Sequence, residues 1–137
     1  MGVKEAICTA HSPQPAGAYS QGLRANGLIF VAGQGPRDPI SGQVAEGIAT
    51  QTHQVLQNIR AILEAVGCTL DNVVKVSAHL ANMADFDAFN CVYAEYFQEP
   101  YPVRTTVGSQ LPGILVEIDA IAVDPEPGSG DRHSLHR

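Results

Sequence analysis

Arg104 is the residue whose type and surroundings point most directly to chemistry. It is the only charged residue between Glu99 and Glu117, in a stretch of apolar, β-branched and turn-forming residues. Such a composition predicts a buried strand followed by a tight loop. Because an unpaired buried charge is costly, Arg104 needs an anionic partner, and its planar guanidinium matches a carboxylate or a phosphate. That partner is either an acid of the protein, such as Glu117 or Asp119 in an interface salt bridge, or an anionic ligand.

The histidines and cysteines show no spacing typical of a metal site or a redox motif. Cys8, Cys68 and Cys91 are odd in number and far apart, which indicates reduced, structural thiols and a cytoplasmic protein. Cys91 is expected to pack rather than to act as a nucleophile, because no histidine is evidently paired with it. His79 falls on the polar side of an alternating segment, where a surface or interface position is expected rather than catalysis. The sequence therefore predicts no metal site.

Length, charge and hydropathy exclude several classes of protein. The 137 residues are about one domain, and 45% hydrophobic residues suffice for a single core. The net charge is −6 and the eight lysines and arginines are scattered, so the chain lacks a basic stripe that would neutralise a nucleic-acid backbone. No apolar run reaches the roughly 18 residues of a membrane span, and residues 1–5 lack the apolar core of a secretory signal. Neither nucleic acid nor a membrane is expected as a partner.

The first half of the chain predicts a β-hairpin followed by a helix. Residues 17–24 and 28–33 favour strands, and the Asn-Gly pair at 26–27 between them is a strong turn signal. Both faces of the second strand are apolar, so both are expected to be covered. Apolar residues recur at spacings of three and four over 48–66, which is typical of an amphipathic helix, and Gly67 is expected to end it.

The second half predicts a strand, a helix and two further strands. Residues 73–81 alternate, and one face of this strand consists of Val74, Val76, Ala78 and Leu80. Asp85 is expected to cap a helix over about 86–97, and strands follow near 103–107 and over 114–123. The order β-β-α-β-α-β-β predicts an α+β domain, a sheet with two helices. We expect one domain over residues 1–124 and a disordered tail over 125–137.

The last strand is apolar on both faces, which is unusual for a sheet covered by helices on one side. One face consists of Val116, Ile118, Ala120 and Ala122. The other face combines the acids Glu117 and Asp119 with large aliphatic residues, namely Leu115, Ile121 and Val123. Such a surface needs a cover that the two predicted helices do not supply, so we expect a partner subunit on it.

Seven segments form an ordered series of motifs along the chain. They are PAGAYSQ at 15–21, LIFVAGQ at 28–34, QTHQVLQNI at 51–59, LDNVVK at 70–75, FDAFNCVYAEYF at 86–97, PVRTTV at 102–107 and VEIDAIAV at 116–123. Each motif alone is weak. The complete series resembles the RidA/YjgF family of reactive-intermediate deaminases, also called the L-PSP endoribonuclease family, over nearly the whole folded part.

The resemblance implies a chorismate-mutase-like α+β fold, with a mixed β-sheet packed with two helices, and a homotrimer with clefts between its subunits. It also implies an enamine/imine deaminase that hydrolyses small 2-imino or 2-enamino acids to 2-keto acids and ammonia, with no cofactor and no metal. The partner would be a small-molecule substrate with a carboxylate. Two alternatives stay open: a non-catalytic module or sensor that binds a small carboxylate in the same cleft, and a ribonuclease, which the acidic charge disfavours.

The resemblance assigns roles to five matching residues. Arg104 matches the arginine that grips the substrate carboxylate, and Glu117 matches the glutamate that positions water. Tyr19 matches a tyrosine that lines the cleft. Gly33 matches a glycine whose backbone lies beside the ligand, and Asn90 matches an asparagine on the second helix.

Three positions depart from the family pattern. Thr106 stands where many of these deaminases have cysteine, and its backbone N–H is still expected to serve the ligand carboxylate. Ala32 stands where serine is common, and the loop 107–116 is one residue shorter than in the best-known members. The resemblance thus gives the catalytic residues Arg104, Glu117 and Tyr19, and the substrate-binding residues Arg104, Thr106, Gly33 and Asn90.

Overall fold

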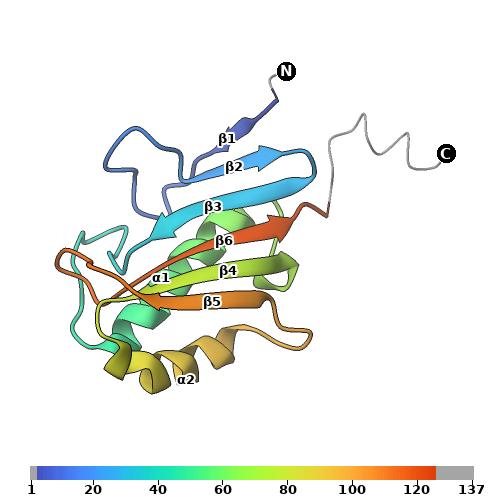
Figure 1. Ribbon diagram of the computed structural model, residues 1–137. Coiled ribbons are helices and arrows are strands. Elements are labelled where there is room, and N and C mark those ends of the chain that lie inside the picture. The colour runs from blue at the N-terminus through green and yellow to red at the C-terminus, as the bar shows by residue number, and fades with distance from the viewer. Residues whose placement is uncertain (1–2, 126–137) are drawn as a thin grey trace.

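The computed structural model describes residues 3–125 as one sheet with two helices (Figure 1). The strands are β1 (Glu5–Ile7), β2 (Gly22–Ala25), β3 (Leu28–Gln34), β4 (Val73–Leu80), β5 (Val103–Gly108) and β6 (Val116–Val123), and the helices are α1 (Ile48–Glu64) and α2 (Phe86–Tyr96). The strand order across the sheet is β1-β2-β3-β6-β4-β5. The β4–β5 pair is parallel and the other pairs are antiparallel, so the sheet is mixed, as expected. All but the first residue of the predicted tail lies outside the described residues.

Both helices pack on one face of the sheet and enclose the core between the two layers (Figure 1). Buried residues of α1 recur at helical spacing: Val55, Leu56, Ile59, Ile62 and Leu63. They meet the inward side chains of the central strands, which include Val76, Ala78, Leu80, Val116, Ile118, Ala120 and Ala122. Each large aliphatic side chain buried in this way contributes about 1.5–3 kcal/mol. The alternation predicted for the last strand is confirmed.

The N-terminal part of the sheet differs from the sequence prediction in two ways. β2 begins only at Gly22, so the first residues of the predicted 17–24 strand lie in a loop. β1 is not expected from the sequence, because three residues are too few for an alternating pattern to stand out. The predicted turn is confirmed, since Asn26 and Gly27 have φ angles of 53° and 80°, as a two-residue hairpin turn requires.

Two local predictions for the second half of the chain are wrong. Val74 is 44% exposed, because the β4–β6 ladder is irregular at this point and Val73 takes its place in the core. Asp85 precedes α2 but its side chain makes no capping hydrogen bond. The side chain of Asn82 instead accepts a hydrogen bond from the Ala84 N–H at 2.9 Å. The helices predicted over 48–66 and 86–97 and the last two strands are confirmed, with ends shifted by at most two residues.

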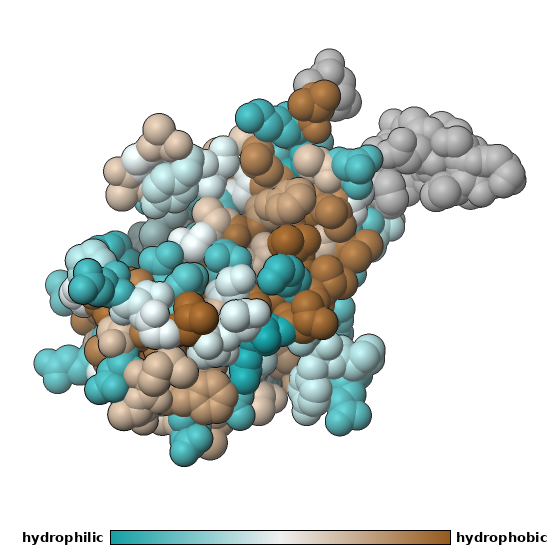
Figure 2. Space-filling view, in the orientation of Figure 1, coloured by the Kyte–Doolittle hydropathy of each residue, from teal (hydrophilic) through white to brown (hydrophobic). Residues whose placement is uncertain are grey.

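The face of the sheet opposite the helices carries exposed apolar side chains. Figure 2 shows this open face, with hydrophobic residues gathered over its strands. Phe30 of β3 and Val123 of β6 are 39% and 44% exposed, although both strands lie inside the sheet. Residues 3–125 therefore cover only one of the two apolar faces of these strands. An uncovered apolar face of this kind favours a partner on that side.

Gln21 fixes the loop that precedes β2 against the sheet. Its side chain is buried, and its amide nitrogen donates to the carbonyls of Thr9, Ser12 and Pro13 at 3.0, 3.2 and 2.9 Å. Its Oε1 accepts a hydrogen bond from the Thr9 N–H at 2.7 Å. One side chain thus satisfies backbone groups of residues 9–13 that have no strand partner there, which holds this stretch as an ordered loop.

Replacing Gln21 with methionine keeps the length of the side chain but removes its hydrogen bonds. Because the backbone groups around it then lose their partners, we expect Gln21→Met to lower the free energy of unfolding by about 1–3 kcal/mol. Urea unfolding measures this change. Gln57→Met, at an exposed position of α1, is the matched control and should shift stability by no more than about 0.5 kcal/mol. Equal stabilities of the two variants would contradict the role given to Gln21.

Candidate functional site

Arg104 lies on β5 with its side chain on the helix-covered face of the sheet. Its register neighbour on β4 is Val76, which is buried under the helices, so both side chains point the same way. The guanidinium donates a hydrogen bond to Asn90 Oδ1 on α2 at 2.9 Å. The predicted buried strand is only partly correct, because β5 is an edge strand and Arg104 is half-buried.

Three aromatic rings of α2 surround the Arg104 guanidinium. Its central carbon lies 4.5 Å from the ring centre of Tyr93, 5.4 Å from that of Phe89 and 5.6 Å from that of Phe86. The spacing of these residues places their side chains on one side of the helix. Cation–π contacts of this kind contribute about 0.5–2 kcal/mol and hold the cation without neutralising it. Local sequence patterns do not reveal that Arg104 faces these rings, because the contact is tertiary.

Arg104 forms no ion pair within residues 3–125. The two ion pairs of this part of the chain both belong to Arg24. Glu117 points to the open face of the sheet, where its register partner is His79, and Asp119 shares that face. Arg104 therefore pairs with neither acid within a single chain, and an interface salt bridge with one of them stays a prediction.

The Arg104 guanidinium borders an open cavity of about 410 Å³. The lining consists of Asn90, Tyr93, Ala94, Tyr101, Pro102 and Arg104. A guanidinium has five N–H donors in a planar fork, and here one bond to Asn90 leaves donors available for a ligand. A positive charge on the wall of a small cavity suits a compact anion such as a carboxylate. We call Arg104, Asn90 and Tyr93 the arginine half-site.

The Tyr93 hydroxyl is an unusual member of the arginine half-site. It is buried and has no hydrogen-bond partner among the described residues. Burial raises the pKa of Tyr93 above its ordinary value of 10.0, and the Arg104 guanidinium opposes part of this rise. The hydroxyl therefore keeps its proton next to the cation, so that Arg104 gains no negative partner from it.

Glu117 lies against Gly33, where the absence of a side chain makes room for its carboxylate. A Cβ atom at Gly33 would lie 2.6 Å from Glu117 Oε2 and 3.2 Å from its carboxyl carbon. The β3–β6 ladder is irregular between Val31 and Gln34, as expected where a glycine lets another group approach closely. The resemblance assigns Gly33 and Glu117 separate roles, but the structure shows that the position of the Glu117 carboxylate depends on the glycine at 33.

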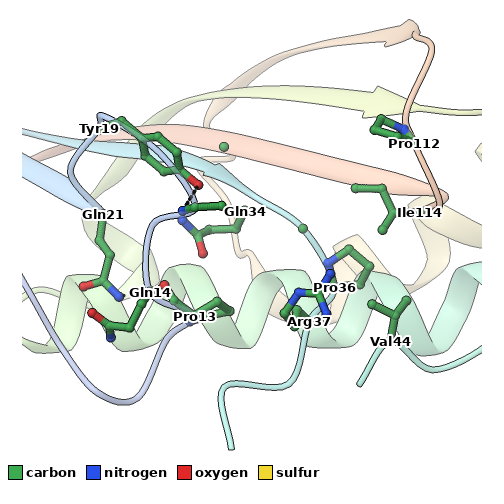
Figure 3. Close-up of a pocket in the computed structure, with 13 residues that line it drawn as sticks. Pro13, Gln14, Tyr19, Gln21, Gln34, Pro36, Arg37, Val44, Pro112 and Ile114 are labelled. Atoms are coloured by element: carbon green, nitrogen blue, oxygen red, sulfur yellow. Dashed lines mark hydrogen bonds between the residues drawn. The ribbon is translucent and has the colours of Figure 1, made fainter. Parts of the chain in front are cut away.

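Tyr19 and Gly33 line a second cavity, of about 200 Å³. Figure 3 shows Tyr19, from the loop before β2, and Ile114, from the loop before β6, on opposite sides of it. Tyr19 is 53% exposed, and its hydroxyl accepts a hydrogen bond from the Ala16 N–H at 3.1 Å. The loop that Gln21 anchors therefore also sets the position of the tyrosine ring. We call Glu117, Gly33 and Tyr19 the glutamate half-site.

The site residues predicted from the sequence fall into two groups within one chain. Thr106 lies on the same face of the sheet as the arginine half-site, because it is two residues after Arg104 and opposite the buried Ala78 of β4. The glutamate half-site belongs to the open side of the sheet, so the sheet itself separates Glu117 from Arg104. A small molecule bound at Arg104 does not reach Glu117 of the same chain.

Residues 3–125 contain no group of three or more histidine, cysteine or acidic residues arranged to hold a metal ion. Cys8, Cys68 and Cys91 are free thiols, and burial raises the pKa of Cys68 above its ordinary value. Neither α1 nor α2 is both long and apolar enough to cross a membrane.

Known proteins with similar sequences identify the family. The family model described as Endoribonuclease L-PSP matches residues 9–124. The chain belongs to this family. A RutC family protein of Pyrococcus horikoshii is 50% identical over 123 residues, which cover 88% of this chain and 98% of the relative. A 2-iminobutanoate/2-iminopropanoate deaminase of Bos taurus is 44% identical over 124 residues, which cover 88% of this chain and 90% of the relative.

A solved structure of the same shape agrees with this assignment to the L-PSP family. The crystal structure of E. coli TdcF with bound serine matches with a TM-score of 0.83 and 32% identity, over 87% of this chain and 98% of that one. The resemblance to the RidA/YjgF family is confirmed. So is the α+β fold that it implied, a mixed sheet packed with two helices.

An alanine at Gly33 should displace the Glu117 carboxylate without unfolding this L-PSP family protein. The added Cβ would overlap the end of a flexible side chain, which can turn away, so we expect a stability loss of about 1 kcal/mol or less. A crystal structure of Gly33→Ala would show the moved carboxylate. Gly17→Ala is the control, because its Cβ would meet Tyr19 only at an ordinary 3.7 Å. An unmoved Glu117 in Gly33→Ala would contradict the steric coupling.

Tyr93→Phe should reduce the loss of folding stability at alkaline pH. The pKa of Tyr93 is raised in the folded state. The contribution of the protonated hydroxyl to folding stability is therefore complete below the unfolded pKa of 10.0 and is lost as pH rises beyond it. We expect the stability of Tyr93→Phe to fall less steeply than that of the original protein between about pH 9 and 11. Near neutral pH the free energy of unfolding of the variant should be within about 1 kcal/mol of that of the original protein, since the variant loses only an unpaired hydroxyl. Urea unfolding at each pH measures both, and parallel pH curves would contradict the expectation.

Proposed function

We propose that this protein is an enamine/imine deaminase that hydrolyses small 2-imino and 2-enamino acids to 2-keto acids and ammonia. The observation that carries the proposal is the Arg104 guanidinium, which borders a cavity and forms no ion pair within residues 3–125. Its shape and charge suit a substrate carboxylate. The name of the bovine relative and the serine bound to TdcF support a small substrate with such a group.

We place the reaction in clefts between the subunits of a homotrimer. Arg104 and Glu117 project to opposite faces of the sheet, so a site that uses both requires two copies of the chain. When each copy offers its arginine half-site to the glutamate half-site of the next, the contact is heterologous and closes into a ring. The family resemblance supports three subunits for that ring. The exposed apolar side chains of the open face support an assembly on this side.

Substrate binding relies on the arginine half-site. Arg104 would hold the carboxylate, and a charge-assisted hydrogen bond of this kind contributes about 1.5–3 kcal/mol. Asn90 and the α2 rings keep the guanidinium in one orientation. The Thr106 N–H would bind the same carboxylate, and Tyr19 of the other copy would close the wall. Anchoring at one end fixes the imine carbon near Glu117, which lowers the entropic part of the barrier.

Glu117 would supply the proton transfers of hydrolysis. Water attacks C2 of the iminium, the C=N π electrons move to nitrogen, and Glu117 accepts one proton of the water. Glu117 returns this proton to nitrogen. The hydroxyl then gives its proton to Glu117 while C=O forms and the C–N bond breaks. The departing ammonia takes this proton and leaves as ammonium, which restores the Glu117 carboxylate and releases the 2-keto acid. An enamine reaches the same iminium by protonation at its β-carbon. Imines already hydrolyse in water, so this chemistry requires no metal or cofactor.

The test couples the protein to an amino-acid oxidase that generates a 2-imino acid in the presence of semicarbazide. Deamination by the protein competes with trapping, so we expect less semicarbazone when the protein is present. Arg104→Ala should lower kcat/KM by about 10- to 100-fold, because it removes the charge-assisted anchor. Arg60→Ala is the matched control, since the Arg60 guanidinium also lies over an aromatic ring, at 5.1 Å from the centre of Tyr96. It should leave kcat/KM unchanged.

Other results of this assay would contradict the proposal in distinct ways. Normal deamination by Arg104→Ala would show that the site is misassigned. If the protein binds a 2-keto acid through Arg104 but does not speed the loss of the imine, the result would favour a binding module or sensor over an enzyme. RNA cleavage that persists through further purification and disappears in Arg104→Ala would favour the ribonuclease.

A further inference from the structure

The chain that leaves β3 presents alternate residues to the second cavity. Gln34 and Pro36 are buried, whereas Gly33 and Arg37 are exposed and Gly35 is half-buried. Because side chains of an extended chain alternate in direction, residues 33, 35 and 37 share the exposed side, and all three line the cavity (Figure 3). Next to the glutamate half-site, the wall of this cavity therefore passes over two residues without side chains and ends at an arginine. We call residues 33 and 35 the glycine track.

The glycine track provides space and is not required by the backbone conformation. The glycines with φ in the left-handed region are Gly27, Gly42, Gly47, Gly67 and Gly113, and neither member of the track is among them. A Cβ atom at residue 35 would lie 3.3 Å from Ile114 Cδ1, on the other side of the cavity. Any side chain at this position would narrow the cavity, so the glycine keeps the way to residue 37 open.

A buried side chain of α1 fixes the backbone from which Arg37 projects. Asn58 Nδ2 donates to the carbonyls of Gly35 and Arg37 at 3.1 and 3.0 Å, and Arg37 forms a β-bridge with Val44. The guanidinium is held as well, because its Nη1 donates to the Gly42 carbonyl at 2.6 Å. Arg37 is therefore an ordered group on the cavity wall, although it is exposed.

The positive charge of Arg37 has no ion-pair partner within residues 3–125, where both ion pairs belong to Arg24. The adjacent acid, Asp38, is engaged in its own turn, since its Oδ1 accepts from the N–H groups of Ile40 and Ser41 at 2.8 and 3.0 Å. One bond to a carbonyl leaves further guanidinium donors available for an anion. A cavity of about 200 Å³ with such a group on its wall suits a short acidic chain.

We propose that the substrates of this protein are 2-imino dicarboxylic acids, whose second carboxylate binds to Arg37. The inference rests on the proposed deaminase function and on the cleft shared between copies. Arg104 of one copy would bind the carboxylate beside the imine carbon, and Glu117 of the other copy would act at that carbon. The rest of the substrate would then lie along the glycine track and reach Arg37 of the same copy as Glu117. Cations at both ends of the cleft favour a molecule with an acid at each end.

The test compares two five-carbon imino acids in the oxidase and semicarbazide assay. One is formed from glutamate and ends in a carboxylate, and the other is formed from norvaline and ends in a methyl group. The original protein should have the higher kcat/KM for the dicarboxylate. Arg37→Gln keeps an N–H donor for the Gly42 carbonyl but loses the charge, so the ratio of the two kcat/KM values should fall about 10-fold. Arg60→Gln is the matched control, because it removes one exposed arginine from α1, and it should leave the ratio unchanged.

Gly35→Val tests the glycine track itself. Its side chain would fill the space beside Ile114, so kcat/KM for both five-carbon imino acids should fall about 10-fold relative to that for the three-carbon imino acid formed from alanine. If the original protein deaminates without preferring the dicarboxylate, or if either variant keeps the original ratio, the inference fails and the proposed function stands. If the original protein deaminates none of the three imino acids, both fail together.

Discussion

The contact between the Arg104 guanidinium and the aromatic side of α2 is the interaction on which the candidate site depends. Partly buried charges are costly unless they are paired, and within residues 3–125 no carboxylate pairs with this one. The ring of Tyr93 and the amide of Asn90 reduce that cost without removing the charge, and the adjoining cavity leaves the cation accessible. The fold thus presents a fixed positive group whose natural complement is an anion from outside the chain.

Strand geometry then decides which groups can act together. Successive side chains of a strand point to opposite faces, so the register that buries Val76 beside Arg104 also sends His79 and Glu117 to the open face. Gly33 lets the Glu117 carboxylate settle against β3 instead of projecting freely. Within a single chain, one small substrate cannot contact both the Arg104 cation and the Glu117 carboxylate, because they lie on opposite faces of the sheet. In a ring of copies the same separation brings the two half-sites face to face, and the exposed apolar strands supply the surface that associates.

The sequence was informative where a local interaction decides the outcome and failed where a tertiary contact does. The 48–66 helix follows from its apolar period, and the alternation of the last strand follows from strand geometry. Sequence pattern favours a strand from residue 17, but β2 begins at Gly22, and the buried side chain of Gln21 ties the neighbouring residues 9–13 by tertiary hydrogen bonds that propensity does not describe. Alternation predicts Val74 in the core, because a sequence pattern does not reveal the irregularity of the β4–β6 ladder at this point. The resemblance supplied the site residues, but only strand order and register show that they divide between two faces.

The central claim is that each working site combines Arg104 of one copy with Glu117 of another. The most direct measurement mixes subunits of Arg104→Ala and Glu117→Gln in one assembly and records deaminase activity. Each variant alone has no intact cleft and should be nearly inactive. Random mixing in a ring should rebuild up to about a quarter of the clefts and restore activity in that proportion. A mixture no more active than its separate components, with subunits shown to have exchanged, would contradict a site shared between copies.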